Sequence, residues 1–194
     1  MSHFSVAVFH KVDESIDELL APYDENLEVE PYLNGDGIYT TYNPNSKWDW
    51  FEIGGRFSKM LINKNTGEHV DFGRVKDIVF PFDGKEYEWR LKFWDANIDN
   101  AFEPEEKQKY PAFFKPEYYK EYYINREDYA RRTALFTTYA VIFNGQWYQK
   151  GNMGWWGMSD DTPEDSRNWD DNYKSRFIDS ADPDWYVTIV DCHI

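Results

Sequence analysis

Two tryptophans, two glycines and an arginine stand close together in residues 47–57, which read KWDWFEIGGRF. On a strand, the two tryptophans would share one face and could stack on a flat ring. The planar guanidinium of the arginine could clamp a carboxylate or a phosphate. Two interpretations stay open: a ligand site, or a β-bulge with core tryptophans and a structural arginine–carboxylate pair. The ligand-site interpretation assigns binding to Trp48, Trp50, Gly54, Gly55 and Arg56.

Glycines and tryptophans meet again in residues 151–158, GNMGWWGM. A loop with three glycines is entropically costly unless it is held in place or used. Its tryptophans could stack on a nucleobase, a cation or a partner's side chain, but the glycine spacing matches no phosphate-binding motif. Binding and packing are equal interpretations here. The ligand-binding candidates are Met153, Trp155 and Trp156.

Acid–base chemistry has four candidates: Asp49, Glu52, Asp191 and His193. On a final strand, Asp191 and His193 would share one face and Cys192 would point to the other, so these neighbours cannot form a Cys–His catalytic pair. A metal between Asp191, His193 and His3 would require the terminal strands to pair. With one cysteine and four histidines, we expect no metal site and no cofactor.

A carboxylate-rich run marks the segment before the last strand, with Asp160, Asp161, Glu164, Asp165, Asp170 and Asp171. The simplest interpretation is a solvated helix start, where carboxylates suit the helix dipole. The alternative is an acidic partner-binding surface that mimics phosphates toward a DNA-binding protein.

Strands are expected to position most of these residues. Alternation and turn signals predict strands at 3–10, 47–62 with a break at the glycines, 77–82, 85–94, 136–143, 146–148 and 185–191. Hairpin turns are predicted at Asp83-Gly84 and Asn144-Gly145, since both dipeptides favour the φ > 0 that such turns need.

Helices are expected in three places. One follows Asp13, one runs from Pro116 to about Arg132, and one begins at the capping box of Thr162 with proline at its first position. Trp169, Tyr173 and Phe177 repeat every four residues, which predicts one aromatic face for the last of these helices. The expected fold is α+β: a largely antiparallel sheet with two or three helices packed on it. We expect one domain over residues 1–194, with long loops at 22–46 and 95–116.

The composition narrows the class of protein. Acidic residues outnumber basic ones 36 to 21, the net charge is −15, and 20% of the 194 residues are aromatic. Aromatic richness disfavours disorder, and a single cysteine excludes a disulfide scaffold. The acidic charge disfavours direct nucleic-acid binding. Neither a membrane span nor a signal peptide is recognisable, so we expect a cytoplasmic protein without membrane contact.

Several short segments of the chain resemble the sequences of an uncharacterised family found in tailed bacteriophages and prophages. They read SHF, LAPYDEN, YNPNSKWDW, IGGR, NGQW, MGWWG and VDCHI. The resemblance spans the chain end to end and is weakest at 95–132, and Phe57 stands where a tryptophan is expected. It implies a phage-encoded, non-virion protein expressed inside the bacterium, and it assigns no catalytic residues.

Three functions follow as hypotheses. The first is a counter-defence binding protein that inhibits a host protein or sequesters a nucleotide signal. The second is a small enzyme acting on a nucleotide or a related phosphorylated molecule, with Arg56 holding the substrate. The third is a structural or assembly role. Binding is favoured over catalysis, because no group of residues meets the requirements of a catalytic site.

Overall fold

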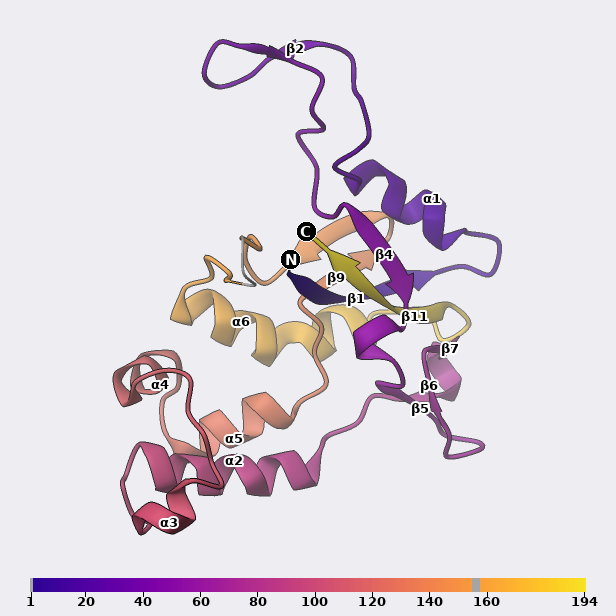
Figure 1. The fold of residues 1–194 in the computed structure, drawn as a ribbon. Coiled ribbons are helices and arrows are strands. Elements are labelled where there is room, and N and C mark those ends of the chain that lie inside the picture. Colours follow the sequence, from indigo (N-terminus) through magenta and orange to yellow (C-terminus); the bar gives the residue numbers. More distant parts are fainter. Residues whose placement is uncertain (1, 155–157) are drawn as a thin grey trace. The chain divides into compact units, whose positions relative to one another are not determined.

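The computed structural model describes residues 2–154 and 158–194 (Figure 1). It is an α+β protein with largely antiparallel sheets, as predicted. The chain divides into two compact units: a sheet unit of Met1–Val79, Thr138–Asp160 and Ser180–Ile194, and a helical unit of Phe80–Thr137 and Asp161–Asp179. Among the described residues, no helix is long and apolar enough to cross a membrane.

The two terminal strands form the centre of the main sheet. β1 (His3–His10) pairs antiparallel with β11 (Tyr186–His193) along its whole length. On its other side β1 runs parallel to β9 (Ala140–Phe143), which continues into β10 (Gln146–Gln149). Beyond β11 lie two antiparallel strands, β4 (Trp50–Ile53) and β7 (Phe72–Arg74). Figure 1 shows β1 and β11 side by side, with both chain ends near them.

Smaller elements complete the sheet unit. A short helix, α1 (Ile16–Leu20), follows β1. A separate three-stranded sheet has the order β6-β5-β8, formed by His69–Val70, Leu61–Asn63 and Ile78–Val79. A two-stranded ribbon contains β2 (Tyr32–Leu33) and β3 (Tyr39–Thr40).

One face of the main sheet packs into an apolar core. Alternate residues of a strand point the same way, so Phe4 and Val6 of β1 lie beside Cys192 of β11 on this face. Leu20 of α1 is fully buried against them. The residues that alternate with these along the two strands, including His3 and His193, consequently belong to the opposite face.

The single thiol of the chain, Cys192, belongs to this core. It is fully buried, and burial raises its pKa well above the ordinary value. We expect Ellman's reagent to leave the folded protein unmodified at mildly alkaline pH and to react with the thiol after denaturation, because only an accessible thiolate attacks. Rapid reaction of the native protein would contradict this burial.

The hairpin predicted at Asn144-Gly145 is confirmed. Both residues have positive φ, at 52° and 72°, and they connect β9 to β10. Positive φ at both central positions gives the turn a twist that matches its flanking strands. This hairpin is the local feature that presents β10 at the edge of the sheet.

The helical unit consists of short helices. They are α2 (Gly84–Asn97), α3 (Pro104–Lys107), α4 (Pro116–Tyr122), α5 (Arg126–Ala134) and α6 (Pro163–Tyr173). The predicted capping box of α6 is present, formed by Thr162 and Asp165. The predicted aromatic face is present too: the ring of Trp169 lies 5.6 Å from that of Tyr173, and Tyr173 lies 5.4 Å from Phe177.

The predicted strand at 85–94 is wrong, because these residues belong to α2. Asp83 does not open a hairpin but caps the helix, accepting hydrogen bonds from the backbone N–H groups of Lys85 and Glu86. The polar residues of the alternation are Glu, Arg and Lys, which are strong helix formers. Glu86 and Arg90, one turn apart, form an ion pair of 2.6 Å. Capping and helix propensity together outweigh the period-two pattern.

The predicted helix from Pro116 to about Arg132 is divided into α4 and α5. The chain leaves the helical region at Tyr123 (φ −129°, ψ 141°), and Asn125 caps the next helix by accepting the N–H of Asp128. Within 95–116, predicted to be a loop, the chain contains the end of α2 and the short α3. The helices are therefore shorter and more numerous than the sequence patterns predicted.

Candidate functional site

The pairing of the terminal strands brings three of the four acid–base candidates together and adds His3. His3 stands opposite His193 in the register of β1 and β11. Nδ1 of His3 lies 2.9 Å from Oδ1 of Asp191, and Nδ1 of His193 lies 2.6 Å from Oδ1 of Asp49. We call these four residues the histidine–aspartate cluster. The fourth candidate, Glu52, stands opposite Asp191 on β4 and is exposed.

The cluster is largely enclosed. The two imidazole rings lie 5.0 Å apart between centroids, in an edge-to-face arrangement. Asp191 is 1% exposed, and Nε2 of His193 is buried without a hydrogen-bond partner in the described structure. Each carboxylate orients its imidazole through Nδ1, which leaves Nε2 as the group that could exchange a proton. No group of His, Cys, Asp or Glu among the described residues has the arrangement of a metal site.

The diglycine that follows β4 wraps around carboxylates of the chain itself. Gly55 has φ +50°, and a Cβ there would lie 2.6 Å from Cβ of Asp191. Gly54 has φ +73°, and a Cβ there would lie 2.8 Å from Cγ of Asp71. The backbone N–H of Arg56 then donates to Oδ2 of Asp191 at 2.9 Å. Two glycines are needed because the backbone must approach two carboxylates in a conformation that other residues rarely adopt.

The guanidinium of Arg56 does not form the structural arginine–carboxylate pair that was one of the two interpretations of this segment. Its backbone, not its guanidinium, binds the carboxylate. The side chain is exposed and forms no hydrogen bond or ion pair with the described residues. The guanidinium is therefore available to an anion from solution.

The two tryptophans of this segment do not share a face. Trp48 is buried in the core beside Leu20 and donates from Nε1 to the carbonyl oxygen of Leu20 at 3.2 Å. Trp50 is 49% exposed, and its ring lies edge-on to that of His3 at 6.4 Å. The regular strand begins only at Trp50, so the alternation expected from a continuous strand does not apply to Trp48.

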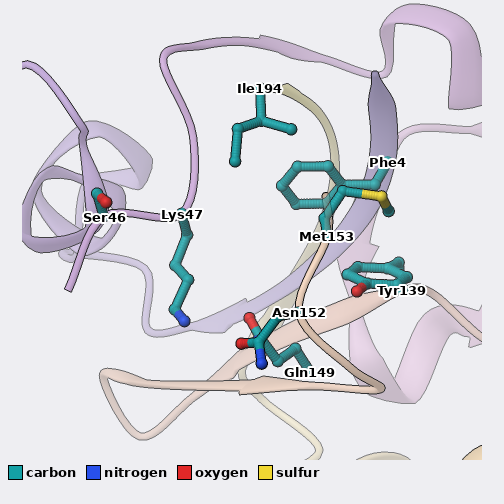
Figure 2. A pocket seen from close by; sticks show the side chains of 8 residues that line it. All are labelled: Phe4, Ser46, Lys47, Tyr139, Gln149, Asn152, Met153 and Ile194. Carbon is teal, nitrogen blue, oxygen red and sulfur yellow. The ribbon is translucent and has the colours of Figure 1, made fainter. Parts of the chain in front are cut away.

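On the face opposite His3 and His193, residues 44–47 and the β9–β10 hairpin contribute to the lining of two neighbouring open pockets. The smaller has a volume of about 90 Å³ (Figure 2). Its lining is Phe4, Ser46, Lys47, Tyr139, Gln149, Asn152, Met153 and Ile194. The larger has a volume of about 400 Å³ and is lined by Tyr23, Pro44, Asn45, Lys47, Gln146, Trp147 and Gln149. Lys47 and Gln149 border both, so we treat them as one site, the Lys47 pocket.

A chain of hydrogen bonds fixes the polar wall of the Lys47 pocket. Nε1 of Trp147 donates to Oε1 of Gln149 at 2.7 Å, and Nε2 of Gln149 donates to Oδ1 of Asn152 at 2.7 Å. Asn152 donates in turn to the Asp160 carboxylate from its side chain and its backbone. These hydrogen bonds from Asn152 are the main cause that holds the pKa of Asp160 below its ordinary value.

The ammonium group of Lys47 is the unsatisfied cation of this pocket. Figure 2 shows it directed toward the amide side chains of Gln149 and Asn152. It makes no hydrogen bond or ion pair with the described residues, and it acts on Asp160 only as a neighbouring charge. A cation held beside amides and aromatic rings can bind an anionic ligand that carries a flat ring.

The ligand-binding candidates are therefore separated. Met153 lines the Lys47 pocket, whereas Gly54, Gly55 and Arg56 follow β4 at the other end of the sheet order. Trp155 and Trp156 lie outside the described residues. Lys47, Gln149 and Asn152 were not among the site candidates. The sequence predicted a hairpin at Asn144-Gly145, but nothing local indicated that residues 44–47 would lie beside it.

The acidic run is largely engaged within the chain. Asp160 binds Asn152, and Asp165 caps α6. Asp171 pairs with Arg131, whereas Asp170 is 9% exposed and pairs with buried Arg132. Glu164 and Asp171 are exposed and Asp161 is half-buried. The phosphate-mimic interpretation has little support from this arrangement, because two of the carboxylates already have arginine partners.

No protein-family model, curated protein or solved structure matches the chain. The geometry of the Lys47 pocket and of the histidine–aspartate cluster therefore carries the functional inference. The two sites differ in whether their charged groups already have partners within the chain. The carboxylates of the cluster are paired, while the Lys47 pocket combines concave space with an unpaired cation.

Proposed function

We propose that this protein is a phage-encoded, non-virion binding protein that sequesters a nucleotide-like ligand inside the bacterial host, and thereby counters a host defence signal. The observation that carries the proposal is the Lys47 pocket, with its unpaired ammonium group beside amides and rings. The phage origin and the bacterial setting depend on the resemblance of the sequence to the phage and prophage family.

The chemistry of the pocket suits a phosphorylated heterocycle. Lys47 supplies a point charge for a phosphate. The amides of Gln146 and Asn45 can donate and accept hydrogen bonds with the edge of a base. Trp147 and Tyr23, whose ring centroids lie 5.1 Å apart, provide an aromatic wall. A volume of about 400 Å³ falls in the range of small-molecule sites, about 300–1,000 Å³.

Sequestration is favoured over catalysis by the state of the reactive groups. The cysteine is buried and its pKa is raised, so it is no nucleophile. Asp191 binds both His3 and the backbone of Arg56, and these bonds hold the terminal strands and the glycine turn together. The reactive groups of the cluster thus have evident structural partners.

Native mass spectrometry with a panel of nucleoside phosphates and cyclic nucleotides tests the proposal. We expect one nucleotide to bind the wild type as a single adduct. Lys47→Gln should weaken this binding by roughly 10- to 100-fold, the effect of one charge-assisted hydrogen bond of about 1.5–3 kcal/mol. Lys64→Gln is the matched control, because Lys64 is an exposed lysine of the same unit outside the pocket lining.

Two outcomes count against the proposal. One is the absence of any adduct with the panel and with extracts of bacterial cells. The other is equal weakening by Lys47→Gln and Lys64→Gln, which would mean that the ligand responds to net charge and not to the pocket.

The second candidate function is an enzyme acting on a nucleotide-like molecule. Its specific support is the pair of carboxylate-oriented imidazoles, His3 and His193, with neighbouring rings. Analysis of the small molecules in the same incubations separates the two functions. A nucleotide that is converted by the wild type but returned intact by His193→Gln would establish catalysis and replace sequestration.

A further inference from the structure

A two-stranded ribbon lies between α1 and β4 in the chain and extends away from the main sheet. We call residues 24–42 the acidic ribbon; Figure 1 labels its first strand, β2. Cross-strand hydrogen bonds hold it, from Val29 N–H to the Thr41 carbonyl at 3.0 Å and from Asn34 N–H to the Ile38 carbonyl at 2.9 Å. At its base, the buried Asn43 donates to the carbonyl oxygens of Pro22 and Asp24, both at 2.9 Å. The ribbon is thus anchored to the sheet unit at one end.

The tip of the acidic ribbon has a defined conformation. The side-chain oxygen of Asn34 accepts the backbone N–H groups of Asp36 and Ile38, at 3.0 and 2.9 Å. Gly37 takes φ +76°, as the tight reversal requires. Order in the free protein lowers the entropy lost when such an element binds.

Apolar side chains of the ribbon face solvent. Leu33 and Tyr39 stand directly opposite each other in the β2–β3 register, and they are 57% and 75% exposed. Other large exposed side chains on the ribbon are Leu27, Ile38 and Tyr42. Directly opposite residues share one face of a ribbon, so Leu33 and Tyr39 form an apolar pair that nothing in the described structure covers. A tyrosine and a leucine side by side are a typical anchor of a protein interface.

The charge of the ribbon restricts what can cover this pair. Residues 24–42 contain no Lys, Arg or His, and their acidic residues are Asp24, Glu25, Glu28, Glu30 and Asp36. A nucleic acid or an anionic lipid surface would be repelled. A second copy would bring two acidic ribbons together in a chain whose net charge is −15. A basic protein surface is the remaining complement.

We propose that the acidic ribbon docks onto a host protein that presents an apolar pocket rimmed by Lys and Arg, with Leu33 and Tyr39 as the anchors. This is a second binding surface, and it goes beyond sequestration of a small ligand. The rim charges guide association and the apolar pair supplies the desolvated centre.

Site-specific photocrosslinking in bacterial cells tests the docking. A benzoylphenylalanine replaces Tyr39 in one variant and Phe113 in the control; Phe113 is an aromatic of the helical unit that is 96% exposed. We expect position 39 alone to crosslink one host protein. Mass spectrometry should identify that protein as basic and place the crosslink in an apolar pocket with a basic rim.

Two further variants make the test specific. Leu33→Ser should abolish the crosslink from position 39, and the triple change Glu28→Lys, Glu30→Lys, Asp36→Lys should do the same. Lys47→Gln should preserve the crosslink, which separates failure of the docking from failure of the ligand proposal. The docking is overturned by no crosslink at position 39, by equal crosslinking at 113, by a crosslink between two copies of this chain, or by survival of the crosslink in Leu33→Ser.

Discussion

Replacing Arg132 by methionine is expected to lower the free energy of unfolding by about 3–5 kcal/mol, the effect of breaking a buried ion pair from one side. The guanidinium of Arg132 is 0% exposed and lies 2.8 Å from Oδ2 of Asp170. It also donates to the Tyr122 carbonyl at 2.8 Å and to Oγ of Ser166 at 2.9 Å. Methionine fills much of the same space but leaves Asp170 buried without its cation.

The neighbouring Arg131 is a matched control for this prediction. Arg131 pairs with Asp171 at 2.7 Å, but the two side chains are 44% and 42% exposed. Solvent screens such a pair, so Arg131→Met should cost about 0–1 kcal/mol. Urea denaturation followed by circular dichroism measures both variants, and similar losses would contradict the assigned role of burial. Should Arg132→Met fail to fold, Asp170→Asn provides a milder perturbation of the same contact.

Gly55→Ala is expected to destabilise the sheet unit by roughly 3 kcal/mol, from backbone strain of about 1–3 kcal/mol together with overpacking of about 1–3 kcal/mol. The residue has φ +50°, and the added Cβ would lie 2.6 Å from Cβ and Oδ2 of Asp191. The turn must then move away from that carboxylate and lose the hydrogen bond from Arg56 N–H. Amide exchange at Arg56 should accelerate as a result.

Gly67→Ala separates the two contributions. Gly67 also has positive φ, at +73°, but nothing lies within 4 Å of an added Cβ. Its substitution should therefore carry only the strain of a left-handed residue, about 1–2 kcal/mol. Thermal unfolding compares the two variants. If both lose the same stability, the contact between Gly55 and Asp191 is not what requires glycine there.

The elements predicted correctly are those that depend on residues close together in the sequence. The Asn144-Gly145 turn, the capping box of Thr162 and the aromatic face that begins in α6 are confirmed. Each depends on residues that are adjacent or only a few positions apart in the sequence. The strand predicted at 85–94 failed because two periodicities competed in the same residues, and the cap at Asp83 decided for the helix.

The candidate sites depended on contacts that the sequence order hides. His3 and Asp191 are 188 positions apart, and Asp49 and His193 are 144 apart, yet the side chains of both pairs lie within hydrogen-bond distance. The four acid–base candidates were chosen from residue type and local spacing, and three of them gather with His3 in the cluster. Lys47 and Asn152 stand next to the candidates Trp48 and Met153 in the sequence, but nothing local indicated that residues 47, 149 and 152 would line one pocket.

By itself, the sequence determined the α+β class, the acidic and aromatic composition, the strands near the two ends of the chain and the hairpin that leads into β10. Only the tertiary structure decided that β1 lies between β9 and β11, which places residues 46–47 and 149–153 around one pocket. The physical reason is that strand order and register result from burying the whole apolar face at once. That burial joins segments with no local preference for each other, and the functional groups follow the strands that carry them.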